Sequence, residues 1–222
     1  MGGGVGPLGQ GLENIVVRVD AINSNTYAGS GNTMFSLINQ DKLTFSGVTY
    51  NSSQGETYFI FGGAGVVTSG KNTGVSGTQS KSMSAWVRFG RKAIQGLMST
   101  GANGAGTGMA LETSSTVWTL GYGNTGTATT VTYNAHQWYF ATYVSEQTSG
   151  STHNIKLYIN GGLAHTAVVT SINLTNNTFR IGCNNSGIGI SGQLARVNFY
   201  NKALSQKEIQ KSYWNYKKRF GL

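Results

Sequence analysis

GQLARVNFYNKALSQKEIQKSYWNYKKRFGL, residues 192–222, closes the chain and predicts a strand followed by a helix. Ser205 and Glu208 have the spacing of a capping box, in which the serine hydroxyl accepts from the backbone N–H of the glutamate and the glutamate carboxylate reaches back. Apolar side chains then recur on one face of the expected helix: Ile209, Tyr213, Tyr216 and Phe220. We therefore expect the helix to run to the end of the chain and to pack this face against a sheet.

The rest of the chain has the composition of strands and turns. It contains 33 glycines and 1 proline in 222 residues, and only 10% of its residues are charged. Short apolar runs separated by Gly, Ser, Thr and Asn indicate about a dozen strands, and Asn160-Gly161 is typical of a type I′ hairpin turn. We therefore predict one all-β domain in residues 12–222 with a short C-terminal α-helix, and a flexible glycine-rich arm in residues 1–11.

The strand predicted for residues 82–89, SMSAWVRF, uses both of its faces. Successive side chains of a strand point to opposite sides. One face therefore carries four apolar residues, and Trp86 lies on the other face. The four apolar residues are Met83, Ala85, Val87 and Phe89.

Five stretches occur in an order that is known from one family: residues 19–33, 82–89, 136–143, 156–163 and 192–222. Together they resemble the laminin-G-like domains of the concanavalin A-like lectin/glucanase superfamily. The closing segment is similar to the variety common in phage virion proteins through Tyr200-Asn201, Leu204-Ser205, Glu208-Ile209 and Arg219-Phe220-Gly221. The resemblance implies a two-sheet antiparallel jelly-roll sandwich with a short C-terminal α-helix. It also implies a non-catalytic phage structural protein, either a capsid decoration protein or a tail or fibre component.

Partners and location follow from this interpretation. Residues 1–11 are glycine-rich and uncharged, so we expect no secretory leader, synthesis in a host cytoplasm and assembly into a virion. No apolar stretch is long enough to predict membrane insertion. We expect other virion proteins, of the capsid or tail, as partners, and a second copy of the chain is a further candidate. The arm would dock on them through Gly2, Gly3, Gly4, Val5 and Leu8.

A carbohydrate-binding module that is not tied to a virion is the alternative. Aromatic side chains can stack on sugar rings, and amides can hydrogen-bond sugar hydroxyls. Trp118, Tyr122 and Asn124 in the stretch VWTLGYGN are the candidate residues, although Trp118 fits a core position equally well. The two interpretations are compatible, because a virion protein can bind host-surface polysaccharide.

The distribution of acidic residues argues against catalysis. Glycosidases usually place two carboxylates roughly 5 to 10 Å apart, on either side of the scissile bond. The chain has seven acids, and none lies within five residues of another: Glu13, Asp20, Asp41, Glu56, Glu112, Glu146 and Glu208. Glu112 stands alone on its predicted strand, and the cap accounts for Glu208. We therefore predict that the protein is not an enzyme.

Metal and cofactor sites are not predicted either. The histidines, His136, His153 and His165, are scattered, and Cys183 lies in the strand-like stretch FRIGCNN, which favours a buried thiol over a reactive one. Many phage-type relatives carry acidic calcium ligands in the stretch that corresponds to residues 61–67. Here the sequence is FGGAGVV, after a strand predicted at residues 57–61, and only neutral oxygens are available nearby: Asn103, Asn124, Asn184 and Asn185.

The net charge of +9 is concentrated in the closing segment. Residues 202–222 contain six Lys or Arg residues and one Glu. A basic, aromatic stripe can bind nucleic acid, but we favour the interpretation in which the aromatic side chains pack on the sandwich and the lysines face water. A third interpretation is that the basic surface docks on an acidic partner, such as a capsid or an anionic glycan.

Overall fold

The computed structural model describes residues 14–52 and 57–222. The arm predicted at residues 1–11, with its proposed docking residues Gly2, Gly3, Gly4, Val5 and Leu8, lies outside the described residues. Within the described part, the chain forms fourteen strands, one α-helix and one 3-10 helix: β1 (Ile15–Asp20), β2 (Thr33–Phe35), β3 (Lys42–Asn51), β4 (Tyr58–Asn72), β5 (Lys81–Phe89), β6 (Gln95–Gly101), β7 (Gly108–Thr113), β8 (Val117–Gly121), β9 (Gly126–Thr132), β10 (Trp138–Ser149), β11 (Thr152–Ile159), β12 (Gly162–Val169), β13 (Thr178–Ile181), β14 (Ser191–Tyr200), α1 (Gln206–Tyr216) and η1 (Lys217–Phe220).

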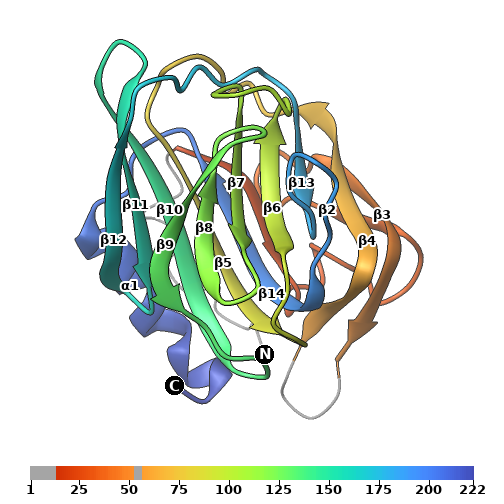
Figure 1. Cartoon of the computed structure of the whole chain (residues 1–222). Coiled ribbons are helices and arrows are strands. Elements are labelled where there is room, and N and C mark those ends of the chain that lie inside the picture. Colours follow the sequence, from red (N-terminus) through yellow and green to blue (C-terminus); the bar gives the residue numbers. More distant parts are fainter. Residues whose placement is uncertain (1–13, 53–56) are drawn as a thin grey trace.

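The strands form one antiparallel sheet that folds over on itself into two layers (Figure 1). The path through the sheet is β12-β11-β10-β5-β14-β4-β13-β6-β7-β8-β9, with β1 paired to β14 and β3 paired to β4. The two ends of this path, β12 and β9, lie side by side, so that the sandwich is nearly closed. The predicted fold class, an all-β jelly-roll sandwich of the concanavalin A-like kind with a short C-terminal helix, is therefore confirmed.

Strand β4 connects the two layers. Its first part pairs with β14, for example Phe61 with Gly192, and its second part pairs with β13, for example Val67 with Ile181. The strand turns at its glycine-rich centre. A Cβ atom on Gly65 would lie 2.4 Å from the carbonyl oxygen of Gly47, which is closer than real contacts allow.

This corner explains the glycines in the stretch that we compared with a calcium motif. Gly63 has a φ of 97°, which side chains rarely adopt, and Gly65 is packed against the backbone of β3. The strand predicted at residues 57–61 in fact continues to Asn72. The sequence pattern ended it too early because a glycine run is typical of a loop, whereas here it allows a strand to bend between layers.

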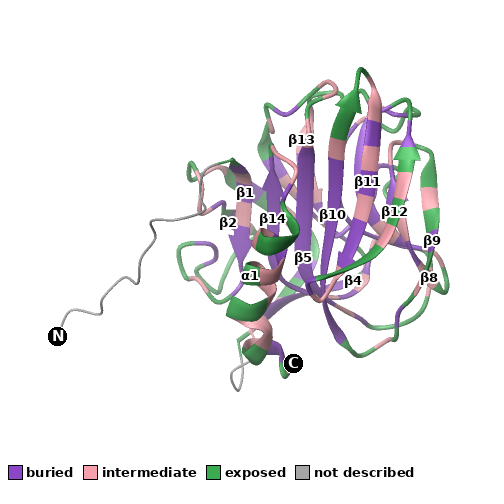
Figure 2. Cartoon of the chain, turned by 90° about the vertical axis from the view of Figure 1, so that its left-hand side faces the viewer, coloured by how far each residue is buried: buried purple, intermediate pink, exposed green. Residues whose placement is uncertain are grey.

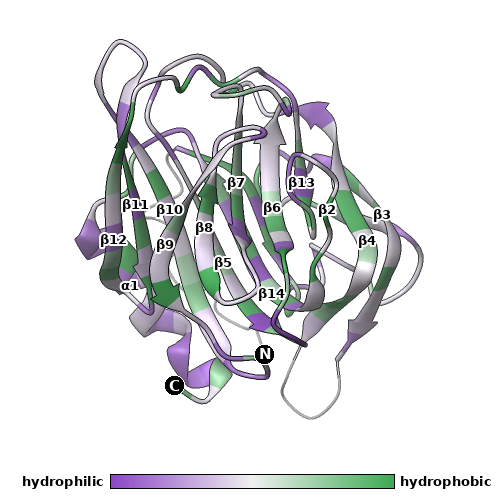
Figure 3. Ribbon diagram, in the orientation of Figure 1, coloured by the Kyte–Doolittle hydropathy of each residue, from purple (hydrophilic) through white to green (hydrophobic). Residues whose placement is uncertain are grey.

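The central strand β5 uses both of its faces, as predicted. Met83 and Val87 point into the main core between the layers, and Trp86 belongs to a second apolar cluster on the outer face. Helix α1 covers this second cluster (Figure 2). Figure 3 shows hydrophobic residues along the strands and hydrophilic residues on α1. The Asn160-Gly161 turn is also confirmed, since both residues have positive φ, 51° and 83°.

The closing helix begins as predicted but ends earlier. The capping box is present: Ser205 Oγ accepts from the Glu208 N–H, and Glu208 Oε2 accepts from the Ser205 N–H at 2.9 Å. Ile209 is fully buried, and the Phe220 ring stacks on Trp86 at 4.1 Å between ring centroids. The α-helix stops at Tyr216 and continues as the 3-10 helix η1, which carries Phe220 into contact with Trp86.

The apolar face of the closing segment therefore packs on the sandwich, as we favoured. Trp214 is an exception, because 60% of its surface is exposed and Lys217 Nζ lies 3.8 Å from its ring centroid.

In the ranges 14–52 and 57–222, neither helix has the length and apolar character needed to span a membrane.

Candidate functional site

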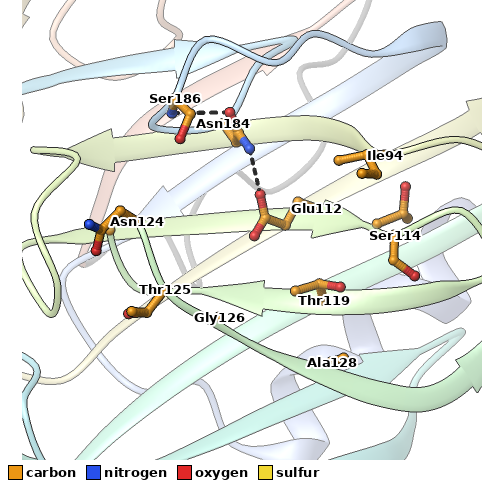
Figure 4. A pocket seen from close by; sticks show the side chains of 12 residues that line it. Ile94, Glu112, Ser114, Thr119, Asn124, Thr125, Gly126, Ala128, Asn184 and Ser186 are labelled. Atoms are coloured by element: carbon orange, nitrogen blue, oxygen red, sulfur yellow. Dashed lines mark hydrogen bonds between the residues drawn. The ribbon is translucent and has the colours of Figure 1, made fainter.

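A cleft of about 280 Å³ lies on the outer face of strands β7, β8 and β9 (Figure 4). Glu112 of β7 pairs with Thr119 of β8, which pairs with Ala128 of β9. Because residues that are opposite one another across a sheet point to the same side, these three side chains form one row across the strands. Their neighbours Leu111 and Leu120 point to the opposite side and belong to the core.

Small residues give the cleft its depth. A Cβ atom on Gly121 would lie 2.8 Å from Glu112 Oε1, and one on Gly126 would lie 3.4 Å from the same oxygen. The Glu112 side chain therefore lies across the backbone of the two neighbouring strands. Larger residues at Gly121 or Gly126 would displace it.

Asn184 holds one oxygen of the Glu112 carboxylate. Asn184 Nδ2 donates to Glu112 Oε2 at 2.7 Å, while Asn184 Oδ1 accepts from the backbone N–H groups of Ser186 and Ile188 at 3.1 and 2.9 Å. The amide is therefore fixed by its own loop, residues 184–189. Within the described ranges, Glu112 Oε1 has no hydrogen-bond partner and Glu112 makes no ion pair.

Burial raises the pKa of Glu112, and the hydrogen bond from Asn184 opposes that effect only in part. The ionised carboxylate is thus short of the hydrogen bonds that water would give it. It is a strong acceptor for hydroxyl or amide donors of a ligand.

The rim of the cleft comes from three loops. Asn124 and Thr125 stand in the β8–β9 hairpin on one side, and Ser186 stands on the other, where its hydroxyl donates to Asn103 Oδ1 at 3.0 Å. Ile94, which is 61% exposed, lies at the far end of the cleft. The lining thus combines one carboxylate, amides, hydroxyls and an apolar surface, a combination suited to a ligand rich in hydroxyl groups.

A second cleft, of about 310 Å³, lies beside β4 and contains Asp41 and Lys71. Asp41 Oδ1 is 3.2 Å from Lys71 Nζ, so the acid there already has a partner. Of these two clefts, the one at Glu112 offers an acceptor that has no partner among the described residues.

The three glycan-binding candidates predicted from the sequence lie in different environments in the structure. The prediction that Trp118 stacks on a sugar is wrong, because its side chain is fully buried on the core side of β8, 5.3 Å from Phe89 between ring centroids. The alternative core position is the correct one. Tyr122 is partly buried against the same core. Only Asn124 is exposed and lines the cleft.

The sequence pattern did not bring Glu112 and Asn184 together. The two residues are 72 positions apart. The sequence pattern predicts Glu112 as a lone acid on its strand and Asn184 as a source of a neutral oxygen ligand. The signal that marks Glu112 is its place on a strand among small residues, Gly108 and Ala110 on one side and Ser114 on the other.

His153 and Cys183, two other titratable residues, are buried and do not line the cleft. His153 is buried with its Nδ1 2.9 Å from Ser145 Oγ, and burial, followed by the charge of Lys81, lowers the pKa of His153 to about 4. Cys183 is buried, as predicted, and burial raises the pKa of its thiol. In the part of the chain that the structure describes, no three His, Cys, Asp or Glu residues gather in a way that could hold a metal ion.

Comparison with known proteins places this geometry in context. The family model described as concanavalin A-like lectin/glucanases superfamily matches residues 61–210. No curated protein sequence matches the chain significantly. Among solved structures, domain 4 of an extracellular GH43 arabinanase from Geobacillus stearothermophilus, in complex with arabinotriose, is similar with a TM-score of 0.66 and 16% identity, over 89% of this chain and 97% of that domain.

Two toxin structures are similar to the same extent. One is of botulinum neurotoxin type C, which depends on two ganglioside molecules to enter cells, with a TM-score of 0.65, 18% identity and 91% of this chain covered. The other is the binding domain of Paraclostridial Mosquitocidal Protein 1, with a TM-score of 0.65, 17% identity and 91% coverage. The chain spans about half of these toxin chains, 51% and 52%. At these identities the likeness concerns the fold.

Proposed function

The chain belongs to the concanavalin A-like lectin/glucanases superfamily, and from this premise we propose that it is a non-catalytic module that binds glycans in the cleft around Glu112. The observation that supports this proposal is the hydrogen bonding of the Glu112 carboxylate. Its Oε2 is held by Asn184 at 2.7 Å, while its Oε1 has no partner among the described residues and faces a cleft with a floor of small residues.

The chemistry of the cleft favours a neutral oligosaccharide. Its lining residues carry one formal charge, that of Glu112, so an acidic sugar would be repelled. Hydroxyl groups of a neutral sugar would donate to the carboxylate and exchange hydrogen bonds with Asn124, Thr125 and Ser186. The fold of an arabinanase domain that binds arabinotriose supports this assignment.

Glu112 alone does not suit hydrolysis. Glycosidases use a pair of carboxylates on either side of the scissile bond, and Glu112 is the one acid among the residues that line the cleft. Asp20 and Asp41, for comparison, pair with Arg or Lys side chains elsewhere. We therefore propose binding without cleavage.

The test is a glycan array followed by titration of the best neutral oligosaccharide. Wild-type protein should bind neutral glycans in preference to sialylated or sulfated ones. Glu112→Gln should lower the affinity about tenfold or more, because it replaces a charge-assisted hydrogen bond by a neutral one. Glu146→Gln is the matched control, since Glu146 pairs with Lys156 on the other layer. Equal loss in both variants, or no binding by wild-type protein, would contradict the proposal.

We further propose that this module is displayed on a phage virion, as a capsid decoration or tail component that aids attachment to host polysaccharide. The similarity of the closing segment to phage virion proteins supports this. Mass spectrometry of washed, intact particles should detect the protein. Protein lacking residues 1–11 should rebind poorly to stripped particles, and equal rebinding would rule out attachment through the arm.

A further inference from the structure

A small cavity of about 20 Å³ lies between helix α1 and the sheet, and it shares no lining residue with the cleft at Glu112. Its polar lining comes from β1, β5, β14 and α1: Arg18, Trp86, Arg196, Asn198, Tyr200 and Ser212. A volume of this size is roughly that of one water-sized probe, so only a single small molecule or ion fits.

Strand register brings the two arginines together. Arg18 of β1 pairs with Asn198 of β14, and Arg196 of β14 pairs with Trp86 of β5. The side chains of Arg18, Asn198, Arg196 and Trp86 all lie on the outer face of the sheet. Their neighbours along the strands, such as Val17 and Val197, point into the main core. Helix α1 then closes over them, with the Tyr216 ring centroid 3.8 Å from the Arg196 guanidinium carbon.

The positive charge in this cavity exceeds the negative charge that the described residues supply. Arg196 Nη1 lies 3.3 Å from Asp20 Oδ2, but Asp20 also pairs with Arg219 at 2.7 Å. Arg18 donates from Nε to Asn198 Oδ1 at 3.1 Å and forms no ion pair within residues 14–52 and 57–222. Burial, and then the charge of Arg196, lower the pKa of Arg18, which is the direction expected for a cation without a counter-charge.

Trp86 lines the same cavity and adds a donor that lacks an acceptor. Its side chain is fully buried, and its Nε1 has no hydrogen-bond partner among the described residues. Tryptophan and arginine side chains only donate hydrogen bonds. An anion would accept from both guanidinium groups and from the indole N–H, and unlike a water molecule it would also offset the charge of Arg18.

We propose that this cavity binds a small monovalent inorganic anion of the halide class, held by Arg18, Arg196 and the Trp86 indole N–H. A halide suits a space that has room for about one water-sized molecule. The bound anion offsets the repulsion between the two guanidinium groups and connects α1 to the sheet beneath it.

The experiment measures the melting temperature of the full chain as a function of chloride, at constant ionic strength, with gluconate as the replacing anion. Chloride should raise the melting temperature along a saturable curve, by roughly 3 to 6 °C at ten times its dissociation constant. Trp86→Phe, which keeps an aromatic ring but removes the donor, should abolish the saturable part. Trp214→Phe, at a residue that is 60% exposed, is the matched control and should retain it.

Bromide provides a second readout that does not depend on a variant. Crystals soaked in bromide should show an anomalous scattering peak within hydrogen-bond reach of Trp86 Nε1 and Arg18. Equal melting temperatures in chloride and gluconate, or a bromide soak without a peak in the cavity, would mean that water fills this space and would overturn the proposal.

Discussion

Arg219 Nη1 lies 2.7 Å from Asp20 Oδ1, although the two residues are 199 positions apart in the chain. Arg219 also donates to the carbonyl oxygen of Thr57 at 3.0 Å, and Arg196 approaches the other carboxylate oxygen at 3.3 Å. The first strand, the closing segment and β14 thus share one buried carboxylate. This contact fixes the end of the chain on the sandwich.

Arg219→Met should lower the stability of the protein markedly. Asp20 would keep Arg196 but lose its second cation, and a hydrogen bond between charged groups contributes about 1.5 to 3 kcal/mol, which corresponds to a fall of about 3 to 12 °C in melting temperature for a chain of this size. Arg91→Met, at an exposed position, is the control and should melt within about 2 °C of wild-type protein. Similar melting temperatures for both variants would show that the pairing contributes little.

The apolar face of α1 should be essential, whereas its exposed aromatic residue should not. Ile209→Ala removes a fully buried side chain beneath the helix and should destabilise the fold by about 2 to 5 kcal/mol. Trp214→Ala, on the same helix but 60% exposed, should change stability by about 0.5 kcal/mol or less. Chemical denaturation measures both. If Ile209→Ala were as stable as wild-type protein, the helix would be only loosely attached.

Glu112→Gln should make the free protein more stable at neutral pH, even though it weakens glycan binding. Burial raises the pKa of Glu112 in the folded state above its unfolded value, so ionising it disfavours folding, and this penalty is complete only above the folded-state pKa. The stability advantage of the variant should therefore be largest at neutral pH and should vanish as the pH falls below the unfolded-state pKa. Melting temperatures of wild-type protein and Glu112→Gln across this pH range show which of the two is more stable at each pH.

His153 should make the wild-type protein sensitive to mild acid. Its pKa is lowered to about 4 by burial and by Lys81, against an ordinary value of 6.5. The stability that comes from keeping His153 neutral is complete above pH 6.5 and is lost as the pH falls towards 4. His153→Asn should lose stability less steeply in this window. His136→Asn is the control, because His136 is exposed and has a φ of 63°, which asparagine tolerates.

Gly65→Ala should damage the corner where β4 passes between the layers. The added methyl group would lie 2.4 Å from the Gly47 carbonyl oxygen, and the resulting strain should cost about 1 to 3 kcal/mol. Gly62→Ala, three residues earlier in the same run, meets no atom within 4 Å and should be nearly neutral. Equal effects in thermal unfolding would mean that the corner adapts freely.

Local sequence patterns predicted those parts of the fold that depend on neighbouring residues. The capping box at Ser205 and Glu208 and the hairpin at Asn160-Gly161 are each set by a few residues of backbone geometry. The two faces of β5 follow from the period of a strand. These interactions are short-range, so they can be recognised without knowing the path of the chain.

The cleft at Glu112 and the bend of β4 at its glycine run could not be derived from local patterns. Trp118 fits a sugar-binding surface and a core equally well in sequence, and only the layer beneath β8 decides that it is buried. The glycine run in β4 is typical of a loop, but contact with Gly47 makes it a bend within a strand.

By itself, the sequence determined an all-β chain closed by a capped helix, because periodicity and turn chemistry are local properties of the chain. The tertiary structure alone decided that Glu112 meets Asn184, and that Arg18 and Arg196 share a cavity beneath α1 with Trp86. The physical reason is strand register. Antiparallel pairing and the folding of one sheet onto itself place residues side by side that lie on separate strands or loops, and no local spacing in the sequence records which strands become neighbours.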